Sequence, residues 1–273
     1  AFIIFYLFVN MAALLGPFLG TVIYRQYGWG VTIATLMCGT LIALYSFWSS
    51  QPAFGPLSLP LRDDLAEHPE TRRQRRRIIA WLALALFMFW TVFYTLGEQF
   101  KEYQATLPLF NKVHAGLRAD GLFAQGLTSE AVTPLFVILV TPVFGGFLYF
   151  LHRRRQNFNP ISKIGIGLCI GILLFGLLRL IGMKAQNLIL YYTVLTVAEL
   201  LVVPVSLSAT SALSSSRALF SMMSGNYLIA GLGSLLADYM ANTTGTVFGI
   251  FVAVAMLAIV TLLYRQRSWA KHF

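Results

Sequence analysis

The chain has 273 residues, of which 58% are hydrophobic and only 11% are charged. Soluble domains carry about 25% charged residues, so this composition excludes an ordinary soluble domain. The apolar runs are continuous rather than alternating, which indicates an all-α integral membrane protein. The net charge of +10 would suit nucleic acid. However, the basic residues lie in short segments between apolar runs, as membrane topology requires, and we expect no nucleic-acid partner.

Windows of about 19 residues predict eight membrane-spanning helices. In chain order they cover residues 1–23, 29–48, 77–104, 131–151, 164–183, 187–211, 217–240 and 245–264. The longest polar segment between them, residues 49–76, is rich in Pro and ends in a run of Arg, and we interpret it as a linker between two helical groups. Of the 20 Lys and Arg residues, fourteen lie in the segments and span ends on the side of residue 1 and five on the other side, while Arg179 lies within a span. This excess places residue 1, the linker and the C-terminus in the cytoplasm. We expect a multi-pass protein of the plasma (inner) membrane.

Glu199 is the most informative residue, because it lies in the middle of an apolar stretch from 187 to 213. A carboxylate at bilayer depth costs a few kcal/mol on insertion scales, so it indicates a proton, ion or substrate site. Helical spacing places it on a mostly polar face, and Pro204 predicts a kink nearby. The face consists of Tyr192, Thr196, Glu199, Val203, Ser206 and Thr210. It is typical of the wall of a water-filled cavity, although a carboxylate that pairs within the bundle for assembly would give the same pattern.

Three other spans contain polar candidates. Glu98 lies in the third span, but Lys101 and Glu102 are near enough in sequence for an ordinary surface pair. Asn10 shares a face with Tyr6, and hydrogen bonding between helices is its ordinary explanation. Asn226 raises the same question in the seventh span.

Signals for enzymatic chemistry are weak. The four His residues lie in separate segments, and neither a metal-ligand spacing nor a nucleophile motif is present. Cys38 and Cys169 fall in different apolar spans, which favours neither a disulfide nor a metal pair. We therefore expect no catalytic residue, metal or cofactor.

Several segments resemble the proton-dependent oligopeptide transporter family of the major facilitator superfamily. FYLFVNMAALLGP contains Asn10 and is similar to the family's fifth-helix motif, and FYTLGEQ contains Glu98 and is similar to its seventh. TPLFVILVTPVFGGFLYF, TVAELLVVPVSLS and MMSGNYLIAGLGS are similar to the motifs of its eighth, tenth and eleventh helices. The resemblance implies that the spans are family helices five to twelve.

The resemblance also implies a domain organisation. Residues 1–48 would be the last two helices of an N-terminal bundle and 49–76 a cytoplasmic linker between the halves. Residues 77–264 would be a complete six-helix C-terminal bundle, and 265–273 a cytoplasmic tail. A major facilitator fold with eight of its helices present is the expected architecture.

A proton-coupled importer of di- or tripeptides is the function that this resemblance implies. Glu199 would bind the substrate's amino group, Glu98 and Glu199 would couple protons, and Asn10 would touch the peptide. The candidate substrate-binding set is Glu199, Asn10, Asn226, Thr133, Tyr192 and Tyr6. The expected partners are protons, a small peptide or peptide-like solute, and membrane lipid.

Two residues depart from the family pattern and leave alternatives open. Thr133 stands where the family has Asn, and Asn226 stands where it has Trp, which predicts a wider and wetter pocket. A transporter of another solute on the same fold therefore remains an alternative. Because the sequence starts within an apolar run, a truncated, transport-inactive binding or assembly protein is another.

Overall fold

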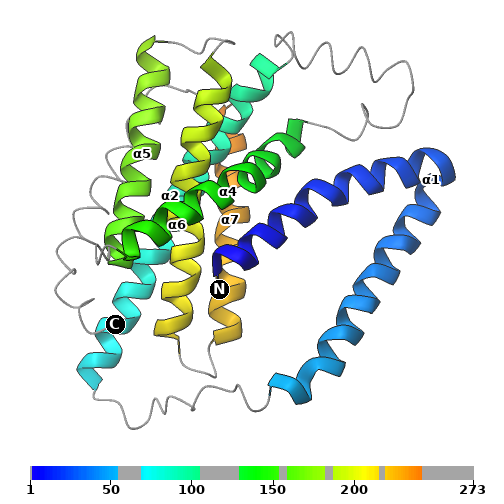
Figure 1. The fold of residues 1–273 in the computed structure, drawn as a ribbon, viewed down its shortest axis with the longest axis horizontal. Coiled ribbons are helices and arrows are strands. Elements are labelled where there is room, and N and C mark those ends of the chain that lie inside the picture. Colours follow the sequence, from blue (N-terminus) through cyan, green and yellow to red (C-terminus); the bar gives the residue numbers. More distant parts are fainter. Residues whose placement is uncertain are drawn as a thin grey trace.

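The computed structural model describes residues 2–54, 69–104, 129–153, 159–181, 187–214 and 219–241. These ranges form six α-helices, which confirms the all-helical prediction (Figure 1). The helices are α1 (Phe2–Phe54), α2 (Pro69–Gln104), α4 (Ser129–Arg153), α5 (Pro160–Ile181), α6 (Leu188–Leu213) and α7 (Leu219–Ala241). Among them, α1, α2, α4, α5 and α6 contain segments long and apolar enough to cross a membrane.

Helix α1 contains both of the first two predicted spans, and it is broken at Gly28. The backbone of Gly28 has φ 77° and ψ 179°, a left-handed φ that only glycine adopts without strain. The break turns the chain back, so that α1 forms two arms (Figure 1). The predicted end and start of these spans, at 23 and 29, therefore flank the observed break.

The other spans agree with the helices apart from their ends. Helix α2 begins at Pro69, earlier than the predicted residue 77. The extension follows from its sequence, since proline suits the first helical position and the Glu, Arg and Gln residues that follow are good helix formers. The expected span 245–264 lies outside the described residues, so the count of eight helices is not confirmed. The division into domains stays a prediction.

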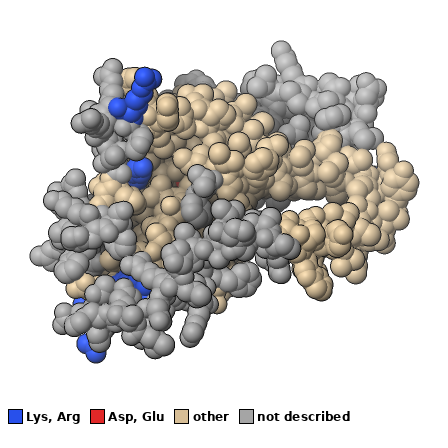
Figure 2. Space-filling model, turned by 60° about the horizontal axis from the view of Figure 1, so that its bottom comes forward, with Lys and Arg blue, Asp and Glu red and all other residues tan. Residues whose placement is uncertain are grey.

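Helix α6 lies at the centre of the described bundle. It contacts each of the other five described helices, and 67% of its most apolar window is buried, against 11% in α1. The second arm of α1 stands away from the bundle (Figure 1). On the face drawn in Figure 2, the visible Lys and Arg side chains lie on the side away from α1, whose surface there is uncharged.

Two glycines let α6 and α7 approach their neighbours closely. A Cβ added at Gly167 of α5 would lie 2.6 Å from Val202 Cγ2 on α6. A Cβ added at Gly233 of α7 would lie 2.8 Å from Trp90 Cβ on α2. Gly167 and Gly171 lie four residues apart on one stripe of α5, and small residues at such spacing let helices approach closely in lipid. This packing fixes α2, α5, α6 and α7 side by side.

Local hydrogen bonds satisfy polar groups within the helices. The hydroxyls of Thr91, Thr95 and Thr141 each donate to the carbonyl four residues earlier. At the start of α5, the Asn159 side chain accepts a hydrogen bond from the Ile161 amide at 2.9 Å, and Pro160 takes the first helical position. Such caps and back-bonds suit a segment in lipid, where no water is present to serve these groups.

Candidate functional site

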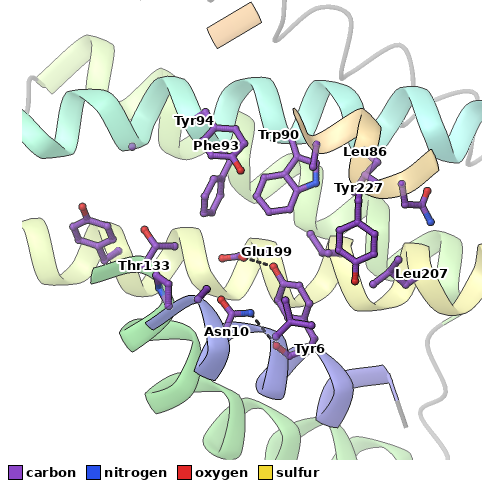
Figure 3. Close-up of a pocket in the computed structure, with 18 residues that line it drawn as sticks. Tyr6, Asn10, Leu86, Trp90, Phe93, Tyr94, Thr133, Glu199, Leu207 and Tyr227 are labelled. Atoms are coloured by element: carbon purple, nitrogen blue, oxygen red, sulfur yellow. Dashed lines mark hydrogen bonds between the residues drawn. The ribbon is translucent and has the colours of Figure 1, made fainter. Parts of the chain in front are cut away.

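A cavity of about 360 Å³ lies between α1, α2, α4, α6 and α7. Figure 3 shows α6 along one side, the aromatic side chains of α2 opposite, and α1 next to α6. Eighteen residues line it: Tyr6, Val9, Asn10, Ala13, Leu86, Trp90, Phe93, Tyr94, Gly97, Thr133, Pro134, Tyr192, Glu199, Val203, Leu207, Asn226, Tyr227 and Ala230. All six candidate substrate-binding residues are among them, so the fold brings together positions from four helices that are distant in sequence.

Glu199 lies at the middle of this cavity, with Thr133 toward one end and Leu207 toward the other (Figure 3). Its side chain is 2% exposed. The Tyr6 hydroxyl of α1 donates a hydrogen bond to Glu199 Oε1. The other oxygen, Oε2, is buried and has no hydrogen-bond partner among the described residues. Because a buried carboxylate oxygen without a partner is unfavourable, this atom is available to a proton or a ligand donor.

Asn10 supports the same site from α1. Its side-chain nitrogen donates to the Tyr6 carbonyl at 3.0 Å, one turn earlier on the same helix. This bond commits the amide nitrogen and orients the side chain, since only the nitrogen can donate to a carbonyl. Asn10 is 7% exposed and lines the cavity. The ordinary explanation, a hydrogen bond between helices, does not describe this contact, because the partner belongs to α1 itself.

Aromatic side chains of α2 face Glu199 across the cavity, and the sequence analysis did not select them. Trp90 stacks on Tyr94, with ring centroids 5.4 Å apart and an interplanar angle of 26°. Phe93 meets Trp90 edge-on, with centroids 5.1 Å apart. The lining positions on α2 follow a spacing of three or four residues, so they form one face. Aromatic faces next to a carboxylate suit a substrate that carries a cation on an apolar body.

The remaining candidates, Thr133, Tyr192 and Asn226, line the cavity from α4, α6 and α7. Thr133 is partly buried on α4, and Tyr192 is buried and stacks on Phe136, with ring centroids 5.2 Å apart. Asn226 is 7% exposed on α7, and its side-chain nitrogen is buried with no hydrogen-bond partner in the described part of the chain. The wall therefore has candidate polar groups from α1, α4, α6 and α7 among mostly apolar residues.

Parts of the predicted polar face and the second carboxylate do not join this set. Thr196, Ser206 and Thr210 are buried but do not line the cavity. After Glu199, the residues of α6 that line the cavity are Val203 and Leu207, at every fourth position. Such a row is inclined to the helix axis and so leaves the predicted face. Helix α6 runs on through Pro204, where a kink was expected. The Glu98 side chain lies outside the described residues, although Gly97 before it lines the cavity.

The described residues offer no metal site. No group of three or more His, Cys, Asp or Glu side chains in the described ranges could hold a metal ion. Cys38 and Cys169 are free, on α1 and α5. The arrangement around Glu199 can thus bind a cation or a proton through a carboxylate, and it can hold an apolar or aromatic group beside it.

Comparison with known proteins gives a family and a fold. The model of the Major Facilitator Superfamily matches residues 1–220. The structure is also similar to crystal structures of the peptide transporter POT. A Glu-to-Gln mutant of POT has a TM-score of 0.53 and 21% identity, and the match covers 96% of this chain and 51% of that one. The same mutant in complex with alafosfalin has a TM-score of 0.58 and 18% identity, and the match covers 98% of this chain and 66% of that one.

A third structure, POT in complex with sulfate, has a TM-score of 0.52 and 22% identity over 96% of this chain and 51% of that chain. At these identities the likeness concerns the fold, and this chain spans about half the length of the first of these transporters. No curated protein sequence matches the chain. The family model covers most of the sequence and agrees with the apolar helical bundle, so the chain belongs to the Major Facilitator Superfamily.

Proposed function

We propose that this chain forms the greater part of a proton-coupled secondary active transporter of the oligopeptide transporter type, which imports di- or tripeptides or related small peptide-like solutes. The observation that carries the proposal is the position of Glu199. It is a buried carboxylate at the middle of an apolar cavity, and its partner Tyr6 belongs to another helix group. Carboxylates in the interior of membrane proteins mark ion and substrate paths.

The position of the cavity supports transport by alternating access. Its lining comes from α1, which we assign to the N-terminal half, and from α2, α4, α6 and α7, which we assign to the C-terminal half. Together with α5 and the expected helix at 245–264, these four helices would make up the six helices of the C-terminal half. Secondary transporters bind substrate between two such halves and expose it to each side by rocking them. We propose that the protein lies in the inner (plasma) membrane. The count of basic residues favours a cytoplasmic C-terminus.

The chemistry of the cavity supports a substrate with an amino group. Glu199 Oε2 can accept a hydrogen bond from an ammonium group, and the rings of Trp90, Phe93 and Tyr94 favour a cation nearby. A proton on Glu199 would remove this attraction and release the substrate. Because a proton and the ammonium group exclude each other at Glu199, import of both in one cycle needs a second proton-carrying group, for which we propose Glu98. Transfer of that proton to Glu199 when the cavity faces the cytoplasm would then release the substrate. The departures from the family pattern at Thr133 and Asn226 affect which solute fits the cavity. The structural similarity to POT, which is a peptide transporter, favours peptides as the solute.

Uptake of labelled dialanine into proteoliposomes tests the proposal, with the full-length protein and an inward proton gradient. We expect gradient-driven uptake in the wild type and its loss in Glu199→Gln, with membrane insertion unchanged. Asp238→Asn, an exposed carboxylate on α7 outside the cavity, is the matched control and is expected to transport normally. Normal driven uptake by Glu199→Gln would contradict the role of Glu199, and no uptake of any peptide by the wild type would contradict the substrate class.

A further inference from the structure

Asn226 is a polar side chain in the wall of the cavity to which the proposed function assigns no specific contact. It is 7% exposed, and no described residue forms a hydrogen bond with its side-chain nitrogen. Tyr227, the next residue on α7, lies near Leu86 and Leu207 at the end of the cavity away from Thr133 (Figure 3). A carboxamide in such apolar surroundings is unfavourable unless a partner satisfies it.

The carboxamide of Asn226 is also uncommitted in its orientation. The amide of Asn10 is fixed by its bond to the Tyr6 carbonyl, whereas no bond to a described residue holds the side-chain nitrogen of Asn226. A half-turn about its last torsion therefore exchanges the oxygen and the nitrogen at the cavity wall. Asn226 can donate to a ligand, accept from it, or do both with a group that has both functions.

The spacing from Glu199 decides which part of a substrate reaches this side chain. Leu207 follows Glu199 by eight residues on α6, which is about 12 Å along the helix. An extended peptide covers about 7 Å with two residues and about 10 Å with three. With the ammonium group at Glu199, the N-terminal residue is too short to reach the end of the cavity where Leu207 and Tyr227 lie. The side chain of the following residue or a third residue can do so.

We infer that Asn226 forms a specificity subsite, which selects peptides whose second side chain carries a hydrogen-bonding group such as a carboxamide. This inference rests on the proposed function and names the substrate class within it. An apolar side chain at this position would leave the carboxamide buried and without a partner. Sites with a buried polar group reject apolar analogues for this reason, more strongly than apolar pockets reject analogues that differ in one methyl group.

Alanyl-asparagine and alanyl-leucine test the subsite, because their second side chains have nearly the same shape and differ in polarity. The measurement is the ratio of their inhibition constants against labelled dialanine uptake, in the full-length protein. We expect the wild type to bind alanyl-asparagine in preference to alanyl-leucine. This preference should be larger in the wild type than in Asn226→Leu, by on the order of tenfold. Asn226→Leu keeps the shape of the side chain, and Asn226→Ala is the second variant, in case the first does not fold. Both variants should shift the ratio toward alanyl-leucine.

The matched control is Ser224→Ala, at an exposed position on α7 outside the cavity, which should keep the wild-type ratio. If the same ratio is found in the wild type and both Asn226 variants, then Asn226 is satisfied by water and the subsite is wrong, while the proposed function stands. If the wild type does not transport dialanine or bind either peptide, the proposed function fails and the subsite fails with it.

Discussion

The hydrogen bond between Tyr6 and Glu199 gives a prediction whose size can be worked out. Tyr6 is 5% exposed, so Tyr6→Phe keeps the packed ring and removes only the donor. A hydrogen bond to an ionised group contributes about 1.5–3 kcal/mol to stability, and one to a neutral group about 0.5–1.5 kcal/mol. Tyr6→Phe should therefore cost about 1.5–3 kcal/mol when Glu199 is present and ionised. In a Glu199→Gln background, where the acceptor is a neutral amide oxygen, the cost should fall to about 0.5–1.5 kcal/mol.

The assay is a double-mutant cycle on the unfolding free energy in detergent, with the wild type, both single variants and the double variant. The expected coupling is the difference of the two costs, about 1–1.5 kcal/mol. Tyr227→Phe is the control, because Tyr227 lines the same cavity but is 48% exposed. Equal losses from Tyr6→Phe in both backgrounds would refute the reasoning, as would a loss of the same size from Tyr227→Phe.

Two glycine substitutions test the packing of the bundle. Gly167→Ala should destabilise the protein by about 1–3 kcal/mol, because the new methyl group would overlap Val202, whereas Gly171→Ala on the same stripe has open space and should cost less than 0.5 kcal/mol. Thermal unfolding in detergent measures both, and equal effects would show that α5 does not approach α6 at Gly167. Gly28→Ala should cost about 1–2 kcal/mol, since its φ of 77° strains any side chain, while Gly30→Ala, with no atom nearby, should be neutral or stabilising. A neutral Gly28→Ala would mean that α1 is not broken there.

The sequence was most informative where a residue contrasts with its surroundings. Glu199 interrupts a long apolar stretch, and its burial at the cavity follows the prediction. The same contrast identified Asn10 and Asn226. The aromatic face of α2 could not be found in this way, because Trp90 and its neighbours lie in a segment that is apolar all round. In such a helix hydrophobic periodicity is weak, and only the positions of α1 and α6 decide which face lines a cavity.

Helical spacing predicted part of the wall formed by α6. Tyr192, Glu199 and Val203 line the cavity as expected, but Leu207 takes the place predicted for Ser206. A wheel of 100° per residue assumes that the neighbours run parallel to the helix. Packed helices cross at an angle, so a contact follows the row of every fourth residue, which winds around the axis. The predicted polar face was thus correct at Tyr192, Glu199 and Val203, and wrong at Thr196 and at the two positions two and three turns after Glu199, Ser206 and Thr210.

The partner of Glu199 could not be predicted from spacing, because 193 residues separate it from Tyr6. This separation gives the bond its importance in the proposed mechanism. Tyr6 belongs to the helix group that we assign to one half and Glu199 to the other, so a movement that separates α1 from α6 must break the bond. A substrate ammonium or a proton on Glu199 weakens the same bond and hence favours that movement. A contribution of about 1.5–3 kcal/mol corresponds to a shift of roughly 10- to 150-fold between two conformations, which is the range of ordinary allosteric coupling. The coupling energy that the double-mutant cycle would measure between Tyr6 and Glu199 therefore sets an upper limit. This contact cannot link occupation of Glu199 to the movement of the halves more strongly than that energy allows.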